Sequence, residues 1–247
     1  MASLSSKQEF KMKKLKNIWN LITVIAGIIR LAFNPNNLSP IFRMKSIRNH
    51  KSFTLCLESM RANPKVNELI KKRYLAPAKY DMAALGSLPE GTLGRVFADH
   101  MSRYNLDVEF YPPMEDRLDD DINYVRQRAR QTHDIFHVVC DIPAIPIGEM
   151  AISSFYLGQH PVPLSAVLIG IGFFVVVFRE PHRIDELMRT IQYGYNMGRN
   201  SESLFSAKWE EIWDMPIEEV RKKFNIQIDS EFFVRNGAIP APVQVAS

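Results

Sequence analysis

Residues 121–140 read DINYVRQRARQTHDIFHVVC, and this stretch predicts one long helix around which the rest of the chain can be organised. An acidic run at residues 116–121 lies where the helix should start, because carboxylates favour the positive N-terminal end of a helix. Pro143 and Pro146 follow the stretch and cannot continue it. We therefore expect the helix to end near Cys140.

One stripe of this helix is polar, with apolar residues on both sides of it. At 100° per residue, five charged or imidazole side chains fall within about 100° of one another. They are Arg126, Arg130, His133, Asp134 and His137. A polar stripe between two apolar ones is typical of the lining of a pocket. The alternative is the solvated face of an amphipathic helix, on which the histidines would be incidental.

Glu149 strengthens the first interpretation. It follows the double-proline turn, in a segment that must fold back near the end of the long helix, so it can add a carboxylate from a second direction. Nitrogen and oxygen donors of this kind suit a divalent metal, with Zn²⁺ as our first choice, Fe²⁺ or Mn²⁺ as alternatives and Mg²⁺ not excluded. The predicted metal ligands are His133, Asp134, His137 and Glu149. No catalytic residue is singled out.

Cysteines and other known signatures add no competing site. Cys56 and Cys140 are too few for a disulfide framework and too far apart for a Cys-x-x-Cys motif, so a metal must be held by His and carboxylates. The protease signature His-Glu-x-x-His would need Glu at position 134, and a di-iron bundle would need two Glu-x-x-His motifs. The remaining histidines have no ligand-like spacing: they are His50, His100, His160 and His182.

The charge is distributed unevenly. The net charge is +4, but residues 11–56 contain nine Lys or Arg and neither Asp nor Glu. These basic residues flank an apolar run at residues 18–33, which favours an amphipathic helix on an anionic membrane surface over nucleic acid. A secretory signal is not indicated, because no small-x-small cleavage site follows. A plain first helix packed on the core is the alternative.

A second apolar run covers residues 162–178, seventeen residues without a charge. It is just short of the roughly 20 residues that span a bilayer, and proline, serine and glycine weaken it further. We expect a central buried helix or the wall of a lipid cavity, with a membrane crossing as the alternative.

The other helices are predicted from apolar residues at helical spacing and from the proline and capping residues at their ends. The predicted ranges are 64–76, 88–101, 148–157, 163–178, 181–197, 209–213 and 217–224. The fold class is therefore all-α, a single helical domain with a basic amphipathic N-terminal segment. We assign residues 1–57 to that membrane-proximal segment, residues 58–230 to a helical metal- and lipid-binding domain, and residues 231–247 to a tail.

At the expected metal ligands, the sequence resembles the ubiquinone (coenzyme Q) biosynthesis protein Coq-four family. Its hallmark is His-Asp-x-x-His, followed by eleven residues and Glu, and His133, Asp134, His137 and Glu149 match it with the spacing intact. Supporting similarities are residues 88–94, the pair Arg126 and Arg130, residues 195–199 and the segment 209–221. The resemblance implies an all-helical fold, peripheral membrane attachment, a divalent metal and a role in prenylated quinone synthesis.

In that family, the role has been described both as organising the biosynthetic enzymes and as removing the ring carboxylate of a polyprenyl hydroxybenzoate, with hydroxylation at the same carbon. Our first hypothesis is the enzyme, a metal-dependent decarboxylase (lyase). The alternative is a non-catalytic lipid-binding scaffold, and a more distant one is a metallohydrolase of prenyl phosphates. Arg126 and Arg130 are the predicted ligand-binding residues, because one anion can touch both the metal and the guanidinium of Arg130.

The expected partners are an isoprenoid lipid or prenylated aromatic acid, an anionic membrane surface, other quinone-biosynthesis enzymes and a second copy of the chain, but no nucleic acid. The first residues lack the Arg-rich, Ser-rich composition of a mitochondrial presequence. We therefore expect a peripheral protein on the cytoplasmic face of a bacterial membrane, or on the mitochondrial inner membrane in a eukaryote.

Overall fold

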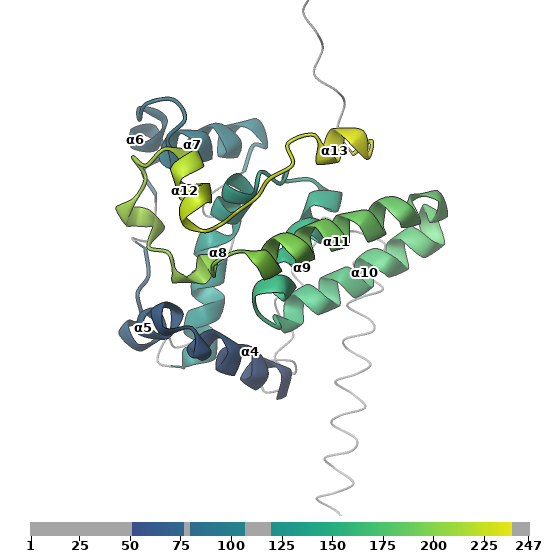
Figure 1. Cartoon of the computed structure of the whole chain (residues 1–247), viewed down its shortest axis with the longest axis horizontal. Helices are drawn as coiled ribbons and strands as arrows, with labels where there is room; N and C mark the ends of the chain where they lie inside the picture. The colour runs from purple at the N-terminus through teal and green to yellow at the C-terminus, as the bar shows by residue number, and fades with distance from the viewer. Residues whose placement is uncertain (1–50, 77–79, 107–119, 239–247) are drawn as a thin grey trace, which may run out of the picture.

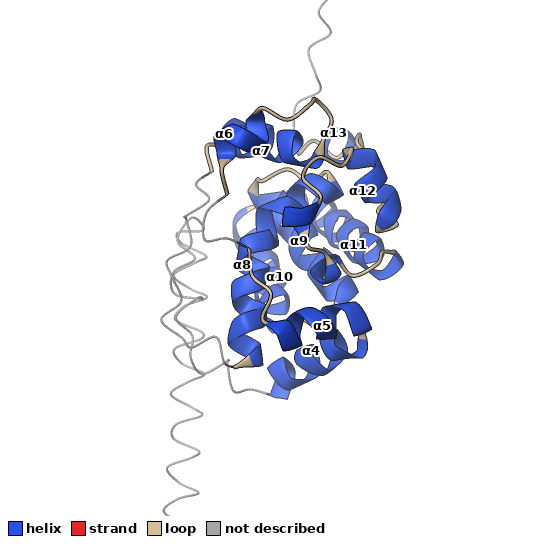
Figure 2. Cartoon of the chain, turned by 90° about the vertical axis from the view of Figure 1, so that its left-hand side faces the viewer, coloured by secondary structure: helices blue, strands red, loops and turns tan. Residues whose placement is uncertain are grey.

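The computed structural model describes residues 51–76, 80–106 and 120–238, and these residues form helices without a named strand (Figures 1 and 2). The all-α prediction is confirmed. The α-helices are α4 (Lys51–Ala62), α5 (Pro64–Lys72), α6 (Met82–Gly86), α7 (Leu93–Arg103), α8 (Asp121–Cys140), α9 (Pro146–Gln159), α10 (Pro163–Arg179), α11 (Ile184–Asn200), α12 (Ile217–Lys223) and α13 (Phe232–Arg235). Short 3₁₀ turns lie at Pro181–Arg183, Leu204–Ser206 and Trp209–Glu211.

Helix α8 runs through the middle of the molecule, as the quoted stretch predicts. It begins after Asp120, whose side chain accepts a hydrogen bond from the Ile122 amide at 2.7 Å, and it ends at Asp141 in the left-handed conformation. The pair α4 and α5 lies at its N-terminal end, and α7 and α12 pack against it nearer its C-terminal end (Figure 1). The central helix therefore joins the two ends of the structure.

Helices α9 and α11 lie side by side with their backbones in direct contact. A Cβ atom added to Gly194 would lie 2.1 Å from the carbonyl oxygen of Ala151, and one added to Gly198 would lie 2.2 Å from that of Phe155. Only glycine fits where two helix backbones come so close. This contact fixes α9, which begins directly after the turn that follows α8.

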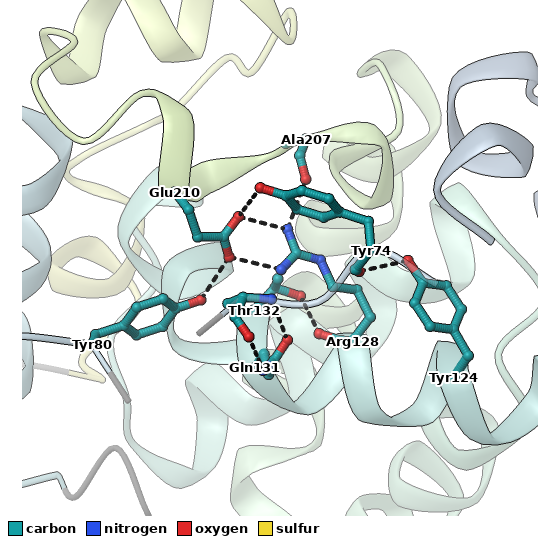
Figure 3. A network of polar contacts seen from close by, with 9 residues as sticks. Tyr74, Tyr80, Tyr124, Arg128, Gln131, Thr132, Ala207 and Glu210 are labelled. Carbon is teal, nitrogen blue, oxygen red and sulfur yellow. Dashed lines mark hydrogen bonds and ion pairs between the residues drawn. The ribbon is translucent and has the colours of Figure 1, made fainter. Parts of the chain in front are cut away.

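A buried polar network ties α8 to the segments on either side of it (Figure 3). The guanidinium of Arg128 donates to the carboxylate of Glu210 at 2.7 Å and to the carbonyl oxygen of Ala207 at 2.9 Å. The hydroxyl groups of Tyr74 and Tyr80 donate to the same carboxylate. Burial alone would raise the pKa of Glu210, but the hydrogen bonds and charge of Arg128 lower it below its usual range. A buried pair of this kind is stable because both charges are hydrogen-bonded.

The expectation of a central buried helix at residues 162–178 is wrong. Helix α10 forms a hairpin with α11 that projects from the body, and Phe178 and Val177 are 71% and 50% exposed (Figure 1). Helix α9 takes the central place instead, with Ala151 and Phe155 fully buried. Among the residues that the structure describes, no helix combines the length and the apolar character needed to cross a membrane.

Two further expectations concern the ends of the chain. The amphipathic helix expected at residues 18–33 lies outside the described residues. Helix α4 crosses the expected boundary at residue 57, and Phe232 and Phe233 of α13 pack into the hydrophobic core.

The close contact of α9 and α11 leads to a stability prediction. Gly194→Ala should lower the free energy of unfolding by about 1–3 kcal/mol, because the new methyl group overpacks a backbone contact. Gly170→Ala is the matched control on the exposed side of α10, where a Cβ meets nothing within 4 Å. It should be neutral or stabilise by up to about 1 kcal/mol through helix propensity. Urea unfolding of both variants measures the difference, and equal effects would contradict the packing account.

Candidate metal centre

Three of the predicted ligands come together. One ligand atom each from His133, His137 and Glu149 forms a group within 4.8 Å. Nε2 of His133 lies 3.4 Å from one carboxylate oxygen of Glu149, and Nε2 of His137 lies 3.1 Å from the other. The two imidazoles come from successive turns of α8, and the carboxylate comes from the first turn of α9.

The turn after α8 fixes the orientation of His137. With Asp141 in the left-handed conformation, the Ile142 amide donates to the carbonyl oxygen of His137 at 2.9 Å. The carbonyl oxygen of Ile142 in turn lies 3.0 Å from Nδ1 of His137. A carbonyl oxygen can only accept, so Nδ1 carries the hydrogen and a neutral imidazole leaves a lone pair on Nε2.

In its neutral form the buried His137 therefore turns a bare Nε2 towards an oxygen of Glu149, and this nitrogen has no hydrogen-bond partner in the part of the chain that the structure describes. Two lone pairs at 3.1 Å repel each other unless a cation lies beside them. A divalent ion satisfies both, and two nitrogens with one carboxylate are a donor set found in zinc and iron proteins. The residues present thus fit a metal.

A tight turn places Glu149 against the end of α8. A Cβ atom added to Gly148 would lie 1.9 Å from the carbonyl oxygen of Pro143, so only glycine allows the chain to fold back here. Pro146 starts α9, and Glu149 lies in its first turn, where the helix dipole favours a negative charge.

The electrostatics of the three side chains are strongly coupled. Burial alone would lower the pKa of His133, but the carboxylate of Glu149 raises it to about 9. Burial alone would raise the pKa of Glu149, but the positive charge that the imidazoles of His137 and His133 carry when protonated holds the pKa of its carboxyl well below its usual range. Without a metal, the raised pKa of His133 means that its imidazole carries a proton beside the carboxylate of Glu149, where a metal ion would otherwise lie.

Side chains outside the group of three contact His133 and the last turn of α8. The hydroxyl of Tyr156 lies 3.5 Å from Nδ1 of His133, and the two rings stack in parallel with their centroids 6.3 Å apart. Arg221 of α12 donates to the carbonyl oxygens of Val139 and Val138 in the last turn of α8. Carbonyls at a helix end otherwise have no partner, so Arg221 stabilises the turn that carries His137.

The remaining predicted residues are not among the three grouped ligands. Asp134 follows His133 on α8 but is not part of that group. Arg126 and Arg130 lie on the same helix, half-buried, and each makes contacts with other residues of the chain. Their roles as a metal ligand and as ligand-binding residues stay predictions.

Sequence reasoning missed two features of α8 and its neighbours. Arg128 lies on the apolar side of α8, near Tyr124 and Ile135. A charged residue among core-facing ones predicts a buried partner of opposite charge, which here is Glu210. His100 of α7 lies beside His137, with ring centroids 6.0 Å apart, although nothing in its local spacing indicates this. Burial lowers the pKa of His100 to about 4, and the neighbouring imidazole of His137 adds to the effect.

Two imidazoles from one helix and a carboxylate from the next define a helical protein with a two-histidine, one-carboxylate site. The comparisons with known proteins give the family. The chain belongs to the family described as coenzyme Q (ubiquinone) biosynthesis protein Coq4, whose model matches residues 9–229. The resemblance seen in the sequence is thereby confirmed, and the family is one of ubiquinone biosynthesis.

Relatives and a solved structure agree with this assignment. The mitochondrial ubiquinone biosynthesis protein COQ4 of Coprinopsis cinerea is 26% identical over 68% of this chain and 58% of its own length. The mitochondrial COQ4 homolog of Aedes aegypti is 30% identical over 60% of this chain and 53% of its own. The chain thus spans little more than half the length of these relatives. A crystal structure from Nostoc punctiforme, provisionally assigned to ubiquinone biosynthesis, has a TM-score of 0.73 at 30% identity and covers 84% of this chain and 97% of that one.

The geometry predicts which residues a metal needs. His137→Ala and Glu149→Ala should each weaken Zn²⁺ binding by roughly 100-fold or more, because a site with so few ligands cannot lose one without a large loss of affinity. The exposed His182→Ala should retain the metal, and Asp134→Asn should lose affinity for it if Asp134 is the fourth ligand that the sequence predicts. Isothermal titration with Zn²⁺ measures all four variants. If His137→Ala and Glu149→Ala bind as the unchanged chain does, the three side chains do not hold the metal.

Proposed function

We propose that this chain acts in the synthesis of a prenylated quinone, as a metal-dependent decarboxylase of a polyprenyl hydroxybenzoate that also serves hydroxylation at the same ring carbon. Family membership supports the pathway. The reaction is supported by one observation above all, the unpartnered Nε2 of the buried His137 facing Glu149. An unpartnered buried nitrogen destabilises the fold, and groups of this kind are found mainly at functional sites.

The protein's own groups set the charge and the geometry of the site. Ile142 and Tyr156 hold the two imidazoles at their Nδ1 atoms, so both Nε2 atoms turn towards Glu149. The low-polarity surroundings of Phe136 and Tyr156 strengthen electrostatic interactions within the site. When bound, a divalent ion supplies a Lewis acid that holds a carboxylate or phenolate oxygen and stabilises negative charge on the ring. Zn²⁺ is our first choice, and Fe²⁺ or Mn²⁺ suits the same donors.

Arg126 and Arg130 remain the proposed contacts for an anionic head group. Arg130 lies three residues before His133, about 4.5 Å along the axis of α8. An anion near His133 would therefore be within reach of a guanidinium, which binds carboxylates through two parallel hydrogen bonds.

Release of carbon dioxide tests the enzymatic proposal. The metal-loaded full chain should release labelled carbon dioxide from a carboxyl-labelled prenyl 4-hydroxybenzoate, and Glu149→Gln should reduce the rate by roughly 100-fold or more, because it removes the charged ligand. His182→Gln, far along the chain on an exposed turn, should keep the full rate. Parallel runs with dioxygen and a reductant, and under nitrogen, show whether a hydroxyl group or a proton replaces the carboxylate.

Binding of the labelled compound without release of carbon dioxide would contradict the decarboxylase and favour the scaffold. The scaffold is the second candidate because the hairpin of α10 and α11 exposes apolar surface. Phe174, Val177, Phe178, Ile184 and Met188 are each at least 38% exposed. Apolar surface on this scale is typical of contact with a lipid or a protein.

We propose that this hairpin dips into a membrane surface, which would bring the site close to a lipid-soluble substrate. Several relatives are named as mitochondrial proteins. The proposed surface is the mitochondrial inner membrane in a eukaryote or the cytoplasmic membrane in a bacterium. The basic segment at residues 11–56, which lies almost wholly outside the described residues, would add attraction to anionic lipid.

The hairpin proposal predicts a change in vesicle binding. The double variant Val177→Ser and Phe178→Ser should bind anionic phospholipid vesicles about ten-fold more weakly, because two apolar side chains no longer enter the bilayer. Leu106→Ser, a change of an exposed apolar residue outside the hairpin, should bind as the unchanged chain does. Vesicle co-sedimentation measures this. Equal binding of all three proteins would place the attachment elsewhere.

A further inference from the structure

His100 approaches the metal centre from a helix that supplies none of its three grouped ligands. It lies on α7, and its ring is tilted by 32° to that of His137, with 6.0 Å between the centroids. Its Nε2 atom is buried and has no hydrogen-bond partner among the described residues. A buried polar atom in this state destabilises the fold unless something satisfies it.

The two unpartnered imidazole nitrogens belong to neighbouring rings. Nε2 of His137 and Nε2 of His100 are both buried without a partner, whereas His160, another buried histidine, has both ring nitrogens matched by the hydroxyl oxygens of Ser59 and Ser203. His160 is therefore satisfied within the fold. The pair at the metal centre is left for a molecule from outside.

A cavity leads to this pair of rings. Its volume is about 330 Å³, and it lies between α7, the turn after α8 and the segment before α13. His100 and His137 form part of its wall, together with Arg103, Tyr104, Ile142 and Phe233. The wall combines a guanidinium and imidazoles with aromatic and aliphatic surface, and the carboxylates of Asp99 and Asp141 also line it. The space exceeds what one aromatic ring with a carboxylate needs.

We propose that His100 positions the ligand of the metal centre: its Nε2–H donates a hydrogen bond to an oxygen of an aromatic carboxylate whose head group reaches the centre through this cavity. This inference rests on the proposed function, because it needs a ligand held at the three-residue group. It assigns a role to a residue on α7 that lies outside the His-Asp-x-x-His motif. The ring of Tyr104, with its centroid 4.8 Å from that of His100, packs against the imidazole.

Binding of 4-hydroxybenzoate to the cobalt-loaded full chain tests the proposal. Co²⁺ in place of Zn²⁺ gives visible absorption bands that change when a ligand binds, so affinity can be read without turnover. His100→Phe keeps the ring volume but has no donor, His100→Gln keeps a donor, and His182→Phe is a control at an exposed histidine. Thermal unfolding shows whether each variant folds.

We expect all three variants to bind Co²⁺ with the stoichiometry of the unchanged chain. His100→Phe should bind 4-hydroxybenzoate at least about ten-fold more weakly, since it loses a hydrogen bond to a charged group, and His100→Gln should recover most of the affinity. His182→Phe should change nothing. If His100→Phe does not fold, the comparison of His100→Gln with His100→Leu replaces it.

Three results would overturn the proposal. Unchanged affinity of His100→Phe would mean that His100 does not meet the ligand. Loss of Co²⁺ from His100→Phe, to the degree seen in His137→Ala, would make it a metal ligand instead. If the unchanged chain takes up no Co²⁺, the metal-dependent function fails together with this inference, whereas the first two results leave that function intact.

Discussion

The hydrogen bond from Nδ1 of His137 to the carbonyl oxygen of Ile142 orients the imidazole at the end of α8 and so determines which ring nitrogen faces the site. The same turn uses the left-handed Asp141 to end the helix, so termination and side-chain orientation have one cause. Because Nδ1 carries the hydrogen, Nε2 presents a lone pair towards Glu149. A ring in the other tautomer would have placed a hydrogen there and left no need for a cation.

The rest of the fold holds this turn in place from three directions. Arg221 contacts the last carbonyls of α8, Gly148 lets the chain fold back within van der Waals distance of Pro143, and Gly194 allows α11 to press against α9. The network around Arg128 and Glu210 fixes the other half of α8. These contacts make the site part of the packed centre of the molecule, while the hairpin of α10 and α11 exposes apolar surface.

Sequence reasoning succeeded where the signal is local. Helical period and a proline turn brought His133, His137 and Glu149 to one place, and Asn63 marked the start of α5 because capping depends only on nearby residues. The position of α10 could not be predicted, since the sequence of an apolar helix has the same pattern whether the helix lies in the core or on the surface. His100 was also out of reach, because its approach depends on how α7 crosses α8, a contact between segments far apart in the chain.

The central claim is that two histidines and one carboxylate hold a single divalent ion. X-ray absorption at the zinc edge of the zinc-loaded full chain tests it most directly, because the scattering of imidazole rings is distinct from that of oxygen ligands. The account predicts one zinc per chain with two imidazole nitrogens at about 2.0–2.1 Å and oxygen donors completing the sphere. A shell of oxygen atoms alone, or one whose two imidazoles persist in His137→Ala, would contradict it.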